Sequence, residues 1–68
     1  MRKTIVQLGW TITATATPVA ELWGASCVIK KRGEPLDYIL EGMFETPEAA
    51  CDAALAFGDR MVLENSSS

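Results

Sequence analysis

A strict alternation of apolar and polar side chains from Thr4 to Thr17 constrains the fold of this chain more than any other feature. Its apolar face would carry Val6, Leu8, Trp10, Ile12, Ala14 and Ala16. Its polar face would carry Gln7, Thr11, Thr13, Thr15 and Thr17. Because successive side chains of a strand point to opposite faces, the pattern predicts one long half-buried β-strand. Gly9 within it predicts a bulge or a close backbone approach, and Pro18 predicts its end.

Two further alternating stretches follow. In the first, Trp23, Ala25, Cys27 and Ile29 would share one face. The sequence Lys31-Arg32-Gly33-Glu34-Pro35 is typical of a polar hairpin turn. The next stretch predicts a strand from about Leu36 to Phe44, with Tyr38, Leu40 and Phe44 toward the core.

Thr46-Pro47-Glu48 is a helix start, with a hydroxyl cap, a proline in the first turn and a carboxylate near the positive helix end. We expect the helix to run from Pro47 to about Glu64. Its apolar stripe would comprise Ala50, Ala53, Ala54, Phe57 and Met61, flanked by Cys51, Leu55 and Val62. Gly58 beside this stripe predicts close contact with the sheet, or alternatively a helix C-cap.

The order of these elements predicts an α+β fold: a three-stranded antiparallel meander with one C-terminal helix packed on one face. We expect one domain over residues 1–68, ordered from about 4 to 64, with a polar tail at 65–68. A chain of this length buries a small core, so a partner or self-association could add stability. The predicted core comprises Leu8, Trp10, Ile12, Trp23, Cys27, Ile29, Leu40, Phe44, Phe57 and Met61.

The sequence contains no histidine, which removes the commonest general base and every imidazole metal ligand. Glu48, Asp52 and Asp59 would lie on an exposed helix face, where carboxylates lack the burial that tunes them for acid and base work. Single glycines form no phosphate-binding loop. We therefore predict no catalytic residue, no cofactor and no enzymatic activity.

The two cysteines, Cys27 and Cys51, are interpreted as buried thiols, and their redox state stays open. Without histidine they supply too few ligands for zinc, so no metal is expected. Gly24-Ala25-Ser26-Cys27 is similar to a lipoprotein box, but the polar stretch before it is unlike a signal peptide. No apolar run approaches a membrane span. The expected location is the cytoplasm, without membrane attachment.

One face of the predicted sheet would remain uncovered by the helix. It would present Thr11, Thr13, Thr15, Ser26, Val28, Lys30, Asp37, Ile39, Glu41 and Met43. Val28, Ile39 and Met43 could be scattered surface residues, or they could form a contiguous patch that marks an interface. The predicted function is a non-enzymatic binding or assembly module that contacts a protein partner, or a second copy, through this face or an edge strand. The candidate partner-binding residues are Thr11, Thr13, Thr15, Val28, Ile39 and Met43.

Two segments, Trp23-Gly24-Ala25-Ser26-Cys27-Val28-Ile29 and Phe44-Glu45-Thr46-Pro47-Glu48-Ala49-Ala50, resemble the DNA-binding modules of plant AP2 domains and phage integrase arm domains. The likeness spans roughly residues 22–61 and implies three strands, a packed helix and DNA reading by the exposed sheet. The chain also resembles small uncharacterised bacterial proteins of this layout, which implies no activity.

The alternative function is therefore nucleic-acid binding, with Lys30, Lys31 and Arg32 on phosphates and the threonines near the groove. The net charge of −3 disfavours it, because phosphate backbones attract positive charge.

Overall fold

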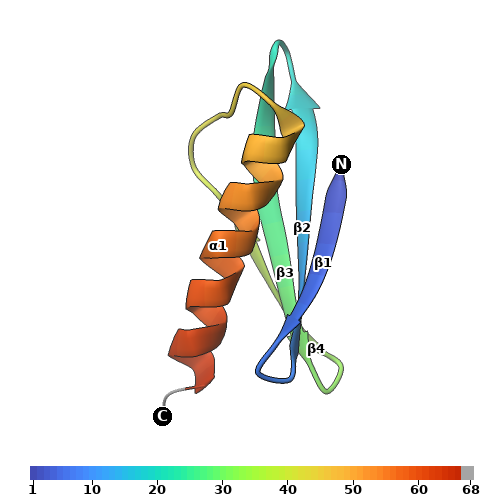
Figure 1. Ribbon diagram of the computed structural model, residues 1–68, viewed down its shortest axis with the longest axis vertical. Helices are drawn as coiled ribbons and strands as arrows, with labels where there is room; N and C mark the ends of the chain where they lie inside the picture. Colours follow the sequence, from blue (N-terminus) through green and yellow to red (C-terminus); the bar gives the residue numbers. More distant parts are fainter. Residues whose placement is uncertain (67–68) are drawn as a thin grey trace.

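The computed structural model describes residues 1–66 as a four-stranded antiparallel sheet with one helix lying lengthwise across one face (Figure 1). The strands follow each other in the sheet in chain order. The elements are β1 (Arg2–Gln7), β2 (Trp10–Val19), β3 (Leu22–Lys31), β4 (Glu34–Ile39) and α1 (Pro47–Ser66). The α+β class and the helix on one face are confirmed, while the prediction of three strands is wrong.

The fourth strand arises because the predicted strand from Thr4 to Thr17 folds back on itself at Leu8 and Gly9. Both turn residues have positive φ, 50° and 81°, as a type I′ hairpin turn requires. The fold-back reverses which face the odd-numbered residues occupy, so Ile5 lies on the helix side and Val6 on the open side. Val6 is 70% exposed and Leu8 57% exposed, so neither belongs to the predicted apolar face.

All three hairpins use two-residue turns, at Leu8-Gly9, Ala20-Glu21 and Arg32-Gly33. The turn predicted around Gly33 is confirmed. The expected strand end at Pro18 is wrong, because β2 continues to Val19. Alternation of hydrogen bonds along β2 turns the Pro18 nitrogen away from β3, toward the side that β1 leaves uncovered. The missing N–H group of proline therefore breaks no bond in the ladder.

The predicted strand from Leu36 to Phe44 is also divided. β4 ends at Ile39, and the segment from Leu40 to Thr46 leads to the helix. Leu40 N donates to Ala25 O at 3.0 Å, and Phe44 exchanges two backbone hydrogen bonds with Trp23 at 2.8 and 2.9 Å. Leu40 and Phe44 thus both remain hydrogen-bonded to β3, and the chain bends away from β3 between them. Tyr38, Leu40 and Phe44 pack on the core as predicted.

The predicted helix start is confirmed, because Thr46 Oγ1 accepts a hydrogen bond from Ala49 N at 3.1 Å. The helix ends at Ser66, two residues beyond the expected Glu64, so residues 65 and 66 of the predicted tail are helical and the rest lies outside the described residues. Its buried residues are Ala50, Cys51, Ala54, Gly58 and Val62. The buried face is therefore rotated from the predicted stripe toward Cys51 and Val62.

Gly58 lies in the middle of α1 and is buried, so the C-cap interpretation is wrong and close packing is confirmed. A Cβ atom there would lie 2.5 Å from Cγ2 of Ile12. The sheet neighbour at this close contact is a strand side chain rather than strand backbone. Small side chains along α1 and on β2 and β3 let the helix pack closely on the sheet, and Ile12, Ile29 and Val62 fill the core nearer its C-terminal end.

Candidate binding surfaces

The outer edge of β1 is the first candidate surface. Ala16 N donates to Met1 O at 2.8 Å, which sets the alternation of hydrogen bonds between β1 and β2. By that alternation, Lys3, Ile5 and Gln7 bond to β2. Arg2, Thr4 and Val6 direct their N–H and C=O groups away from it. Within residues 1–66 no strand pairs with this side, so these main-chain groups face solvent.

The side chains around this edge are unusually apolar for exposed positions. Ile5, Val6 and Leu8 are 40%, 70% and 57% exposed. β1 contains no proline and no acidic residue, and its register with β2 is continuous from Arg2 to Gln7. Proline, bulges and inward charges are the usual means of protecting an edge strand. This edge lacks proline and a bulge, and its two charged side chains, Arg2 and Lys3, both lie at one end. The outward groups of Thr4 and Val6 therefore remain open to another strand.

Contacts on its helix side hold β1 in place. Lys3 Nζ lies 3.3 Å from Asp52 Oδ1 of α1, in an exposed ion pair. Cys51 Sγ donates a weak hydrogen bond to Met1 O at 3.5 Å. β1 thus contacts α1 on one face and pairs with β2 along its inner edge. Among residues 1–66, no strand pairs with its outer edge.

The outer edge of β4 is also six residues long, but its residues are less suited to pairing with another strand. Leu40 N bonds to Ala25 O, so the alternation turns the backbone of Pro35, Asp37 and Ile39 outward. Pro35 has no N–H group to offer an incoming strand. Asp37 adds a charged side chain beside it. Pro35 and Asp37 therefore disfavour the pairing of β4 with an added strand.

The open face of the sheet carries most of the predicted partner-binding residues. Thr11, Thr13, Thr15, Val28 and Ile39 all lie on the side away from α1. Val28 is directly opposite Asp37, and Ile39 is directly opposite Ser26, so Val28 and Ile39 are diagonal neighbours. Met43 lies on the segment after β4. Ile39 is 87% exposed and Met43 45% exposed.

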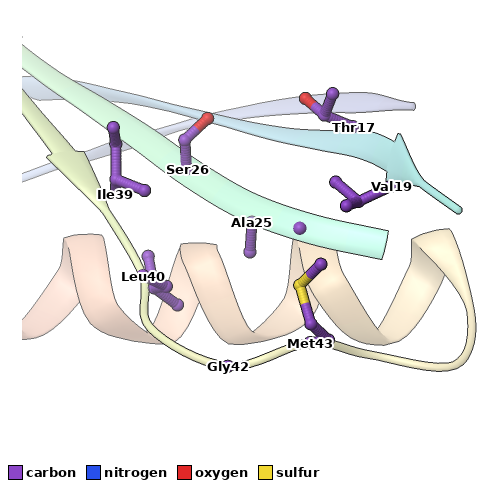
Figure 2. Close-up of a pocket in the computed structure, with 9 residues that line it drawn as sticks. Thr17, Val19, Ala25, Ser26, Ile39, Leu40, Gly42 and Met43 are labelled. Atoms are coloured by element: carbon purple, nitrogen blue, oxygen red, sulfur yellow. The ribbon is translucent and has the colours of Figure 1, made fainter. Parts of the chain in front are cut away.

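Ile39 and Met43 border a shallow groove of about 370 Å³ between the start of β3 and the segment after β4, with lining residues from both faces of the sheet (Figure 2). Its lining consists of Thr17, Val19, Gly24, Ala25, Ser26, Ile39, Leu40, Gly42 and Met43. The groove contains no charged side chain, and Val28 does not line it. The sequence does not predict Val19 on this surface, because Pro18 predicts the end of the strand before it. The odd-numbered alternation from Thr11 onward, continued past Pro18, would have found it.

The three basic residues of the alternative function do not converge on one surface. Lys30 and Lys31 are neighbours in β3, so they lie on opposite faces of the sheet. Lys31 Nζ stands over the Trp10 ring, 5.7 Å from its centroid, on the helix side. Lys31 pairs in register with Glu34, whose carboxylate offsets the positive charge of this turn. Only Lys30 shares the open face with the three threonines.

The described residues offer little for chemistry. They contain no group of three or more side chains that could hold a metal ion. Burial raises the pKa of the Cys27 thiol, which disfavours the reactive thiolate, and Cys27 and Cys51 are both free and buried. Glu48 and Asp52 are exposed, and Asp59 is half-buried. In residues 1–66, α1 is too polar to cross a membrane.

The chain matches no protein-family model, no curated protein and no solved structure.

Proposed function

We propose that this chain is a non-enzymatic protein-binding module that receives an extended segment at the outer edge of β1. The observation that supports this is the row of outward N–H and C=O groups on Arg2, Thr4 and Val6. An added strand would bond to these groups and extend the sheet, as in β-augmentation. Main-chain hydrogen bonds would then supply affinity.

Side chains beside the edge add an apolar contribution. An incoming strand would cover Val6 on the open face of the sheet and Ile5 on the helix face. Burial of apolar surface contributes about 25 cal/mol per Å² removed from water. The two free thiols fit the reducing cytoplasm predicted from the sequence.

The test uses two chemically synthesised chains that differ only in the position of one backbone N-methyl group. Methylation at Thr4 removes an outward donor of β1, and methylation at Asp37 removes an outward donor of β4 as the matched control. Neither donor takes part in the native ladders. The unmodified chain, held at low density on a surface, is used to select binders from a random library of displayed peptides.

We expect the selected peptides to lose binding to the chain methylated at Thr4 and to bind the Asp37 control normally. Equal binding to both chains, or no binder to the unmodified chain, would contradict the proposed function.

A further inference from the structure

We infer that the segment received by β1 is β1 of a second copy, antiparallel, with Thr4 opposite Thr4. This rests on the proposed function and names its partner. The two sheets would join into one continuous eight-stranded sheet. Three features of the molecule support this partner: the register that the outward groups allow, the placement of the charges and the protection of the other edge.

Register follows from hydrogen-bond geometry. In an antiparallel pair, residues with outward groups must lie opposite one another to exchange both bonds. Thr4 can therefore face Arg2, Thr4 or Val6 of the second copy. Facing Arg2, it would place the two Lys3 side chains directly opposite, which is unfavourable. Facing Val6, it would place Arg2 opposite Leu8, which lies in the turn with φ of 50° and is not extended.

Thr4 opposite Thr4 satisfies every outward group. Arg2 then faces Val6 of the second copy, Val6 faces Arg2, and about six main-chain hydrogen bonds form. On the helix face, Lys3 faces Ile5. The aliphatic stems of Arg2 and Lys3 can cover the exposed Val6 and Ile5 while their charged groups reach water.

The charges of β1 also favour the antiparallel direction over the parallel one. Both basic residues lie at one end of the strand, so a parallel pair would align Arg2 and Lys3 with their own copies. In the antiparallel pair each basic residue faces an aliphatic one. Like charges directly opposite are avoided throughout the six residues of β1.

Symmetry limits the assembly to two copies. The two-fold axis runs perpendicular to the sheet, so both helices lie on one face and the open faces join on the other. The new outer edges are the two β4 strands, which Pro35 and Asp37 protect. A head-to-tail pairing of β1 with β4 would instead give an open filament. The missing donor and the charge on β4 oppose it.

The experiment compares Val6→Glu with Val6→Lys in the full chain by sedimentation equilibrium. Val6 is largely exposed, so both variants should fold, and circular dichroism is the check of folding. Both lose the same apolar side chain, and only the sign of the charge opposite Arg2 differs. Two such pairs form in each dimer, so we expect Val6→Glu to dimerise about tenfold more tightly than Val6→Lys at low salt. The difference should shrink as salt rises.

Three results would overturn the inference. The unmodified chain could remain monomeric up to millimolar concentration, the two Val6 variants could dimerise equally, or N-methylation at Thr4 could leave dimerisation unchanged. If the chain is monomeric and selected peptides still require the Thr4 donor, the proposed function stands and only the second copy is wrong as partner. If neither dimer nor peptide forms at β1, both proposals fail.

Discussion

The two edge strands of this sheet have six residues each and differ in almost everything else. β1 carries aliphatic and basic side chains with all its outward N–H groups available, and an exposed ion pair links it to the helix. β4 carries a proline and an aspartate on its outer edge. Its Tyr38 ring packs edge-on against Phe57 of α1, with ring centroids 5.4 Å apart. This difference supports the proposal that an added strand pairs with β1 rather than with β4.

The largest effect should come from the aromatic pair that holds β4. Tyr38→Ala removes a ring that packs against both core clusters, so we expect the free energy of unfolding to fall by about 2–3 kcal/mol in urea titration. Tyr38→Phe keeps the ring and should cost less than about 0.5 kcal/mol. A small loss in Tyr38→Ala would mean that β4 is held by its backbone alone.

Gly58→Ala tests how closely α1 packs on the central strands, which lie between the two edges. The added methyl group would press on Cγ2 of Ile12, a fully buried β-branched side chain with little room to move. Overpacking costs about 1–3 kcal/mol and the gain in helix propensity is about 1 kcal/mol, so we expect a net loss of up to about 2 kcal/mol.

Adding Ile12→Leu, which removes that branch, should make the penalty of Gly58→Ala smaller by coupling between the two sites. Thermal unfolding of the four proteins gives the comparison. A Gly58→Ala protein more stable than the parent would show that the helix lies farther from β2.

Removing the protection of β4 should change assembly without a large change in folding. Replacing Pro35 and Asp37 by threonine gives β4 an outer edge like that of β1. We expect sedimentation velocity to show species larger than a dimer that grow with concentration. If this variant forms no species beyond those of the parent, these two residues are not what ends the sheet.

The smallest effect should come from the ion pair that links β1 to the helix. The Lys3 and Asp52 side chains are 42% and 68% exposed, so solvent screens their attraction. Asp52→Asn should therefore lower the free energy of unfolding by less than about 1 kcal/mol in urea titration. A loss well above this value would show that the pair, rather than the ladder with β2, positions β1.

Much of this architecture is predictable from the sequence. The helix start at Thr46 and the turn at Gly33 follow from local chemistry, because capping and turn formation depend on nearby residues. The close packing of Gly58 follows from the helical phase, which places it beside the apolar stripe, although the strand residue that it contacts, Ile12, is distant in the sequence. The break at Leu8 and Gly9 was missed because leucine is not a usual turn residue. A strand from 4 to 17 would also exceed the length of about 3–10 residues common in globular proteins, which was the available signal.

The candidate edge could not be predicted in the same way. Whether Thr4 directs its N–H outward depends on the number of strands and on the register with Ala14 and Thr13. Once β1 is separated from β2, Val6 moves from the predicted apolar face to the open side. A single turn thus decides both the strand count and the exposed edge.

Amide hydrogen exchange of the unmodified chain, followed by NMR at increasing protein concentration, compares the two edges without any substitution. The Thr4 and Val6 amides point out from β1, and the Asp37 amide points out from β4. We predict that exchange at Thr4 and Val6 slows as concentration rises, while exchange at Asp37 stays fast. Concentration-independent exchange at Thr4, or slowing at Asp37 instead, would contradict the assignment of β1 as the edge that accepts a strand.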